Sequence, residues 1–388
     1  MIDMKANMGQ SRMKILVLDG QNQNTLAIVR HLGPIHIIHV AGAKKFCLSF
    51  FSRYAKKRIV IADPKKNPDG FVKQLKAVLE GENYDLLMPV GFRSYQLCAQ
   101  HQESLRKLTN LILTSSDNIE LASDKHATYS LAEEIGVPYP KTYPIQEVSD
   151  FEKLELNIPL VIKFPFESGK NVVEYAYDIN SARKIFSTMM EMNSGPRKAL
   201  PIVQEYIVGD GYGFFAYYDQ GVCKRTFMHH RIREYPVTGG ASVCAESFSD
   251  GELFRYGKKL LDHLKWDGVA MVEFKKDNKD GKYKLMEINP KFWGSLELAI
   301  ESGVNFPSML ADRARGKEVE ESNRFNQVTF HWIINGELFH FLSRPSSIVK
   351  IFQSMKKSKS DFRMADIKPN LFQVLNIFVH YYKKITNR

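Results

Sequence analysis

Two glutamates and one asparagine carry the clearest chemistry in this sequence. Glu273 lies in one apolar run, and Glu287 and Asn289 lie in a second apolar run that follows it. The polar segment between the runs, residues 275–282, contains an Asp-Gly turn signal. Two apolar runs joined in this way predict an antiparallel hairpin, with Glu273 beside Glu287.

The spacing of these side chains predicts a metal site. Strand alternation would place Leu285, Glu287 and Asn289 on one face of the second strand. Two neighbouring carboxylates repel each other, and a hard cation between them relieves that repulsion. Mg²⁺ prefers carboxylate and amide oxygens, so Glu273, Glu287 and Asn289 are the predicted ligands. Spacing alone leaves one alternative open, a hairpin whose charges face water.

The segment before residue 115 predicts a parallel, Rossmann-like sheet, because short apolar runs alternate with amphipathic segments. A helix is expected to begin with Ser123 as its N-cap and to end at Gly136. The segment lacks the GxGxxG pattern, so no dinucleotide site is expected. The expected strands cover residues 14–18, 35–40, 58–61, 86–88 and 111–113.

Composition limits the class of protein. The chain has 388 residues and 44% hydrophobic content, which predicts two or three domains. It has no apolar run of roughly 18 residues and begins with a polar segment, so a cytoplasmic protein is expected. The net charge of +11 favours anionic partners, but no nucleic-acid motif accompanies it, and specific nucleic-acid binding is not expected. The four cysteines show no CxxC spacing and are expected to be reduced thiols.

Several motifs together resemble one known family. The segment at residues 287–307 reads EINPKFWGSLELAIESGVNFP. Earlier motifs are Ser123-Asp124-Lys125, Val161-Ile162-Lys163, Gln204-Glu205-Tyr206 and Thr238-Gly239-Gly240-Ala241-Ser242. On these motifs, the chain resembles the ATP-grasp family and is similar to carbamoyl phosphate synthetase large subunits and biotin carboxylases. The resemblance extends over most of residues 14–315.

The resemblance implies an α/β fold of the ATP-grasp type. It has an N-terminal Rossmann-like preATP-grasp domain, two α+β lid subdomains that sandwich ATP, and here a C-terminal helical extension. The expected divisions are a leader at 1–12, the preATP-grasp domain at 13–120, the ATP-grasp domain at 121–317 and the extension at 318–388. Within the ATP-grasp domain, the lid subdomain would cover 141–205 and the metal-binding subdomain 206–317.

By the same resemblance, one set of residues would bind ATP. Lys125 and Lys163 would contact its phosphates, and Ser168 and Gly169 would belong to a phosphate flap. The sequence has no P-loop, which removes the commonest alternative phosphate site. The adenine would be held by Glu205, Tyr206 and Ile207, and the ribose by Asp210.

A second set would act on the transferred phosphate and the substrate carboxylate. Arginine forks suit such oxygens. Many relatives have arginine where this chain has Lys291, which offers a point charge instead of a fork. The predicted catalytic residues are Arg231, Arg233, Gly239, Gly240, Ser242 and Lys291.

The activity that the resemblance implies is that of an ADP-forming carboxylate-amine ligase. It would use ATP with Mg²⁺ or Mn²⁺, form an acylphosphate, and act on a small-molecule carboxylate and an amine. Two alternatives remain open, a phosphotransferase on the same scaffold and a non-catalytic ATP-binding module.

The tail after residue 318 is basic and rich in aromatic residues. Its last helix is expected to open near Pro369 with a broad apolar face. We expect this face to pack on the body or on a second subunit, as in a homodimer. Docking on a membrane surface, which would use the same face, is the alternative. The residues of the face are Leu371, Phe372, Leu375, Phe378, Val379 and Tyr382.

Overall fold

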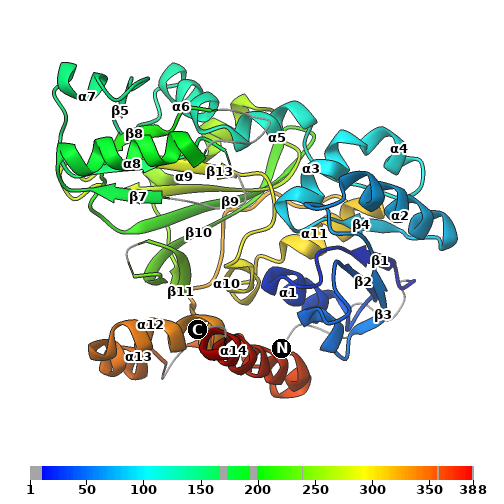
Figure 1. Ribbon diagram of the computed structural model, residues 1–388. Helices are drawn as coiled ribbons and strands as arrows, with labels where there is room; N and C mark the ends of the chain where they lie inside the picture. Colours follow the sequence, from blue (N-terminus) through cyan, green and yellow to red (C-terminus); the bar gives the residue numbers. More distant parts are fainter. Residues whose placement is uncertain (1–10, 167–172, 193–198, 238, 356–357, 387–388) are drawn as a thin grey trace.

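The computed structural model describes residues 11–166, 173–192, 199–237, 239–355 and 358–386 (Figure 1). In this part of the chain the strands form three sheets, with helices packed against them. None of the described helices combines the length and apolar character that crossing a bilayer requires.

The first sheet confirms the predicted parallel arrangement, with strand order β3-β2-β1-β4. Residues 111–113 were expected as a further strand but do not form one. Arg106 donates to the carbonyl groups of Leu111 and Leu113, and a single bridge joins Asn110 to Leu86. The elements are β1 (Lys14–Val17), α1 (Gln23–Leu32), β2 (Ile37–Gly42), η1 (Leu48–Phe51), β3 (Ala55–Val60), α2 (Pro68–Gly81), β4 (Leu86–Met88), α3 (Phe92–Gln100), α4 (Gln102–Arg106) and α5 (Ser116–Ser123).

The linking helix begins one residue later than expected. Ser123 is the last residue of α5, and the carboxylate of Asp124 accepts from the backbone of His126 to cap α6 (Lys125–Glu134). This cap places Lys125 at the first turn of the helix, and the chain leaves the helix through Gly136 at a φ of 66°.

The second sheet is small and antiparallel, with order β5-β8-β6-β7. Buried apolar side chains such as Phe151 and Phe186 fill the space between this sheet and its helices. The elements are β5 (Thr142–Tyr143), α7 (Asp150–Lys153), β6 (Leu160–Lys163), β7 (Val173–Ala176), α8 (Ile179–Met192) and β8 (Ile202–Glu205).

The third sheet has the order β13-β12-β9-β10-β11-β14-β15. One buried cluster joins it to the first sheet, since Val17 and Val40 belong to the same core as Phe215, Trp293 and Phe306. The elements before the tail are β9 (Gly211–Asp219), β10 (Val222–Tyr235), β11 (Ala241–Ser247), α9 (Gly251–His263), β12 (Gly268–Lys276), β13 (Tyr283–Asn289), α10 (Leu296–Glu301) and α11 (Phe306–Ala314).

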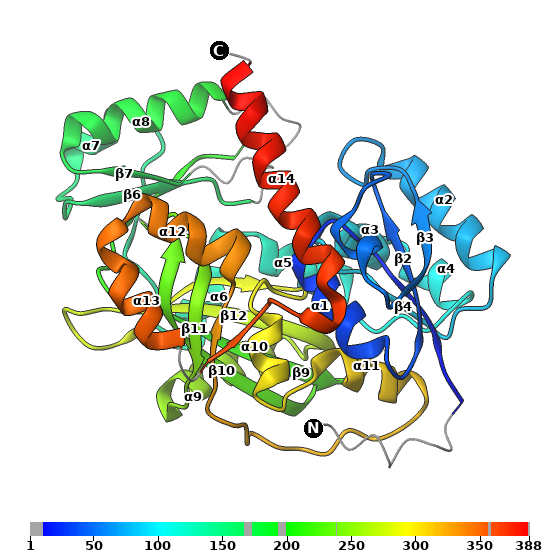
Figure 2. The same cartoon turned by 90° about the horizontal axis from the view of Figure 1, so that it is seen from below.

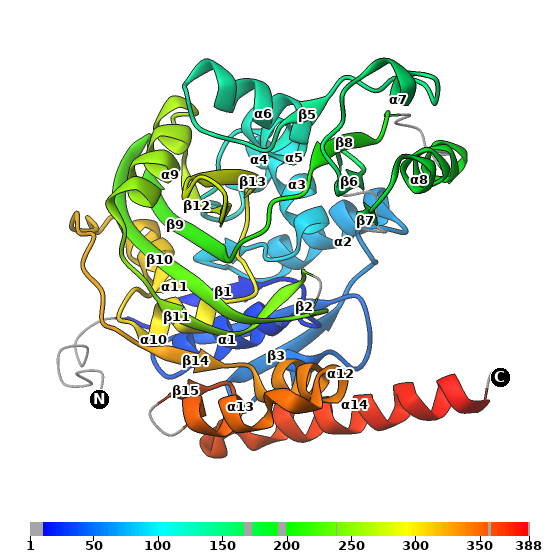
Figure 3. The same cartoon turned by 90° about the vertical axis from the view of Figure 1, so that its left-hand side faces the viewer.

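The tail contributes to the third sheet before it turns helical, because its first strand pairs with β11. Its helices lie on the side of the molecule opposite the second sheet (Figure 3). The last helix begins at Ile367, close to the predicted start. The elements are β14 (Thr329–His331), η2 (Ile333–Glu337), α12 (Leu338–Ser343), η3 (Pro345–Ser347), α13 (Ile348–Met355), β15 (Lys359–Ser360), η4 (Met364–Asp366) and α14 (Ile367–Thr386).

Candidate active site

A cavity of about 1530 Å³ lies where the three sheets meet. Its wall includes Asn22 and Arg93 at the starts of α1 and α3, Lys163 from the second sheet and Glu273 from the third. Single small-molecule sites occupy roughly 300–1,000 Å³. The cavity therefore has room for a nucleotide and for a second substrate beside it.

Glu273 and Glu287 are direct partners in the register of β12 and β13, as the hairpin prediction required. The predicted face of the second strand is wrong at one position, however. The register shifts after this pair, so that Phe274 lies opposite Leu285. Leu285 consequently joins the apolar core, whereas Met286 lines the cavity with Glu287. A bulge of this kind changes strand alternation by one residue, which the apolar pattern alone does not reveal.

Each glutamate of the pair has a cation of its own. Arg231 Nη2 lies 2.6 Å from Glu273 Oε2, and Lys125 Nζ lies 3.7 Å from Glu287 Oε2. Burial raises the pKa of Glu273, a change that Arg231 opposes. Burial also acts to raise the pKa of Glu287, but Lys125 and the hydrogen bond from Asn289 outweigh it and lower the pKa. The pair is thus held together by surrounding positive charge.

Asn289 and Lys291 extend this group along the chain. Asn289 Nδ2 donates to Glu287 Oε1 over 2.7 Å, and Lys291 Nζ donates to Asn289 Oδ1 over 3.1 Å. Two carboxylates and a carboxamide oxygen are the donor set that suits Mg²⁺. The residues present therefore fit the metal that the ATP-grasp resemblance implies, and Glu273, Glu287 and Asn289 would hold it.

Lys163 lies at the end of β6 with its amine almost fully buried. Its Nζ donates to the hydroxyl of Tyr129 over 2.9 Å, and that hydroxyl donates to the carbonyl of Met286. Burial lowers the pKa of Lys163 to about 8, although Glu287 and Glu273 favour the charged form. A buried amine on the cavity wall, held by the hydroxyl of Tyr129, is suited to an anionic ligand in the cavity.

The predicted adenine residues line the same cavity. Glu205, Tyr206 and Ile207 form one stretch of its wall, and Lys275 Nζ donates to the carbonyl of Ile207 over 3.3 Å. Asp210 lies outside the wall, where its carboxylate is exposed and pairs with His230. The structure thus gives no support for a ribose contact by Asp210.

The predicted substrate loop is brought to the cavity by β10 and β11. Arg231, Gly239, Gly240 and Ser242 all line it. Gly239 has a φ of 130°, a conformation that side-chain-bearing residues rarely adopt. The predicted flap residues Ser168 and Gly169 lie outside the described part of the chain.

Arg233 does not line the cavity, in contrast to Arg231 two residues earlier. Its guanidinium donates from Nε to both carboxylate oxygens of Glu337 over 3.1 Å, and from Nη2 to Ser354 over 2.9 Å. We therefore do not assign it a substrate contact. Its position ties the tail to the strand that carries Arg231.

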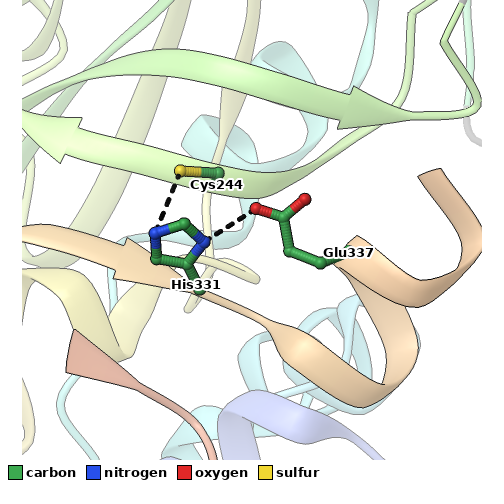
Figure 4. Close-up of side chains that lie close together, drawn as sticks. All are labelled: Cys244, His331 and Glu337. Atoms are coloured by element: carbon green, nitrogen blue, oxygen red, sulfur yellow. Dashed lines mark hydrogen bonds and ion pairs between the residues drawn. The ribbon is translucent and has the colours of Figure 1, made fainter. Parts of the chain in front are cut away.

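Glu337 also belongs to a buried row of side chains with His331 and Cys244 (Figure 4). His331 Nδ1 lies 2.7 Å from Glu337 Oε1, and His331 Nε2 lies 3.8 Å from Cys244 Sγ. The three residues each offer one ligand atom within 4.8 Å of the others, but both ring nitrogens of His331 already have partners in the row. Burial raises the pKa of Cys244 to about 12, so the thiol stays protonated beside the ring. The row is a structural hydrogen-bond chain between β11, β14 and the tail.

Three buried donors on the cavity wall have no acceptor among the described residues. They are Gln23 Nε2, Arg231 Nε and Trp293 Nε1. An unpaired buried donor costs roughly 1–3 kcal/mol, so a ligand rich in acceptor oxygens would relieve that cost. Gln23 is the first residue of α1, and Trp293 lies between β13 and α10. Neither was among the predicted site residues, although Trp293 lies within the motif at residues 287–307.

Lys275 also lines the cavity but was not among the predicted site residues. It was assigned to the turn, whereas β12 continues to Lys276 and β13 begins at Tyr283. Lys275 lies two residues after Glu273 and therefore shares its side of the strand. Strand alternation could have identified it.

Comparison with known proteins gives consistent results. A family model described as "ATP-grasp in the biosynthetic pathway with Ter operon" matches residues 230–334. The chain is 25% identical over 343 residues to D-aspartate ligase from Enterococcus faecium, which covers 79% of this chain and 78% of that protein.

Solved structures share the fold. The biotin carboxylase from Campylobacter jejuni, in its β,γ-ATP complex, matches with a TM-score of 0.68 at 14% identity, over 82% of this chain and 75% of that one. The biotin carboxylase domain dimer of Hydrogenobacter thermophilus 2-oxoglutarate carboxylase, solved with MgADP, matches with a TM-score of 0.64 at 15% identity, over 82% and 74%. The three sheets, the paired glutamates and these similarities identify the fold of the chain as an ATP-grasp fold.

Proposed function

We propose that the chain is an ADP-forming ligase that joins a carboxylate to an amine at the expense of ATP. The observation that carries the proposal is the direct pairing of Glu273 with Glu287 in a cavity that also presents Lys125, Lys163 and Lys291. Phosphoryl transfer depends on positioned cations around the phosphates, and this wall supplies them.

The reaction would proceed in two steps. A carboxylate oxygen attacks the γ-phosphorus of ATP, the bond to the β-phosphate oxygen breaks, and ADP leaves. The acylphosphate so formed has a good leaving group, which the carboxylate lacked. The amine then attacks the carbonyl carbon, inorganic phosphate leaves, and the amine loses a proton. Exclusion of water protects the acylphosphate between these steps.

The residues on the cavity wall divide this work. Lys125 and Lys163 would bind the phosphates, and Arg231 would hold the transferred phosphoryl group through its unpaired Nε. Glu273, Glu287 and Asn289 would hold Mg²⁺, or Mn²⁺ in its place, and that ion would neutralise charge on the phosphates. Glu205, Tyr206 and Ile207 would receive the adenine.

We further propose an amino acid as the substrate that supplies the carboxylate. Similarity to a D-aspartate ligase over most of both chains supports this class. Gln23 Nε2 and Trp293 Nε1 are unpaired donors on the cavity wall. They are suited to the oxygens of a carboxylate.

Two finer points belong to the same proposal. A location in the cytoplasm would give the enzyme its ATP. A homodimer is supported by the dimeric biotin carboxylase domain with the same fold. Sedimentation of the purified chain would test the second point, because a monomer at micromolar concentration would contradict it.

The function can be tested by ADP release from Mg-ATP with pooled amino acids and pooled amines, supplied separately and together. A ligase releases ADP at an appreciable rate only when both pools are present. Release with one pool and a stable phosphorylated product would identify a phosphotransferase instead. Nucleotide binding without release under any condition would favour a non-catalytic ATP-binding module.

A further inference from the structure

The tail helices carry large apolar side chains that the body does not cover. On α14, Leu371, Leu375 and Phe378 are 60%, 58% and 67% exposed. With Val374 and Val379, which are also exposed, they follow the spacing of one helical stripe. Of the expected partners, the body therefore covers only part of this face, which leaves a second subunit or a membrane surface for the stripe. Phe372 does pack, stacking on Phe51 at 4.1 Å between ring centroids, but the stripe points elsewhere.

The two preceding helices continue this exposed surface. In Figure 2, which views the molecule from below, α12 and α13 lie in front of the third sheet, and α14 runs beside them. Val349 and Phe352 of α13 are 60% and 63% exposed, and Leu342 of α12 is exposed as well. We call the exposed apolar side chains of these three helices the tail surface. They are Leu338, Leu342, Val349, Phe352, Met355, Leu371, Val374, Leu375, Phe378 and Val379.

The start of α14 is fixed firmly to the body. Arg30, buried in α1, donates to the carboxylate of Asp366 at 3.1 Å and to the side chain of Asn370 at 2.9 Å. Asp366 also accepts from Ser52. The helix then runs away from this anchor along the lower side of the molecule (Figure 3). The exposed stripe is thus presented by an anchored helix.

The segment that forms the tail helices is predominantly positive. The sequence from residue 338 to residue 388 contains ten lysine or arginine residues and two aspartates, Asp361 and Asp366. Both aspartates are buried in the anchor. Of the described cations, Arg344, Lys350 and Lys368 are exposed among the apolar side chains. The surface is consequently apolar and cationic, without an exposed carboxylate in its described part.

We propose that the tail surface binds the anionic face of a lipid membrane. Apolar side chains interspersed with lysine and arginine are the features by which helices lie in a membrane interface. Anionic headgroups add a favourable interaction with each nearby cation. A second copy of the chain fits less well, because an isologous contact would bring two surfaces of the same positive charge together.

The proposal can be tested with the full-length chain and sedimentable vesicles. One set contains phosphatidylcholine alone, and the other contains equal parts phosphatidylcholine and phosphatidylglycerol. We expect at least tenfold tighter binding to the anionic set. Raising the salt from about 0.1 M to about 1 M shortens the Debye length from about 10 Å to about 3 Å and should weaken binding severalfold. Equal binding to both sets, or no binding, would overturn the proposal.

Two neighbouring positions of α14 provide a matched pair of variants. Leu375→Glu places a charge within the stripe, whereas Asn376→Glu places the same charge at an exposed position beside it. We expect Leu375→Glu to reduce vesicle binding at least tenfold and Asn376→Glu to reduce it less than threefold. Equal losses would overturn the proposal, since charge alone would then explain them.

Two further measurements separate membrane binding from unfolding and from self-association. Both variants should unfold at the temperature of the unchanged chain, because neither side chain is buried, and both should release ADP at its rate in solution. If Leu375→Glu instead converts a dimer to a monomer while the unchanged chain ignores anionic vesicles, the tail surface is a subunit interface and the membrane proposal fails. Failure of the ligase assay would leave the vesicle result unaffected.

Discussion

Glu273 and Glu287 lie opposite each other on β12 and β13, and each is neutralised by a different cation, Arg231 for the first and Lys125 for the second. Two half-buried carboxylates so close would otherwise repel each other. The arrangement divides the positive charge between the β10 side and the α6 side of the cavity. It also makes the two glutamates unequal, because the pKa of Glu287 is lowered and that of Glu273 is raised.

This pairing predicts the effect of removing one carboxylate. Glu287→Ala should reduce turnover at least a hundredfold, which corresponds to about 3 kcal/mol of transition-state stabilisation. Glu246→Ala is a suitable control, since Glu246 lies on β11 outside the cavity wall. Steady-state ADP release measures both variants. A folded Glu287→Ala variant with near-normal turnover would remove the metal assignment.

The buried amine of Lys163 predicts a pH dependence of nucleotide binding. Burial lowers its pKa to about 8, so the amine is charged below that pH and loses its charge above it. The affinity for ADP should therefore fall as the pH rises through about 8 and above. Lys163→Met should bind ADP more weakly and without this pH dependence. Calorimetric titrations between about pH 6.5 and pH 9.5 would decide, and a parallel decline in both proteins would contradict the assignment.

Arg231 and Arg233 should behave differently although they are two residues apart. Arg231→Met removes a cation from the cavity and should reduce turnover at least a hundredfold. Arg233→Met leaves the buried carboxylate of Glu337 without its cation and should lower the free energy of unfolding by about 3–5 kcal/mol. Where it remains folded, Arg233→Met should keep turnover within about tenfold.

Denaturant unfolding combined with ADP release separates these two effects. A loss of turnover in Arg233→Met equal to that in Arg231→Met, at full stability, would restore the substrate contact predicted from the sequence. The reverse result, a destabilised chain with nearly normal turnover, would support the positioning role.

Glu297 predicts that stability falls as the pH rises. Burial raises its pKa from 4.5 to about 7, and Asp361 adds to the shift. The folded chain therefore binds this proton more tightly than the unfolded chain does. The contribution of Glu297 to the free energy of unfolding is full below about pH 4.5 and is lost as the pH rises to about 7.

Glu297→Gln removes this titration and should stabilise the chain at pH 8 by up to about 3 kcal/mol, with a smaller change at pH 5. Urea unfolding at the two pH values measures the difference. Glu134→Gln, at an exposed position of α6, controls for the loss of one charge. An unchanged pH slope in Glu297→Gln would show that another group is responsible.

The parts of the site that could be predicted from the sequence are those set by local patterns. Alternation and the Asp-Gly turn were enough to pair Glu273 with Glu287, and apolar runs were enough for the first parallel sheet. The bulge at Met286 could not be predicted, because it depends on how β13 fits β12 and not on which residues are apolar.

Contacts distant in sequence account for most of the remaining differences. Arg233 resembled a catalytic arginine until its partner Glu337, 104 residues away, was placed beside it. Gln23 and Trp293 meet at one cavity because α1 packs against α10 and α11, which follow β13 in the chain. The exposed stripe of α14 was predicted as an apolar face, but which part of that face the body covers depends on the anchor formed by Arg30.

The most direct test of the proposed ligase follows oxygen-18 from the substrate carboxylate. With the amino acid and amine that support ADP release, one labelled carboxylate oxygen should appear in inorganic phosphate for each ADP formed, and none should appear with Glu287→Ala. This transfer requires a bond between the carboxylate oxygen and the γ-phosphorus of ATP. Phosphate that remains unlabelled while ADP and the amide accumulate would contradict an acylphosphate and with it the account of the site given above.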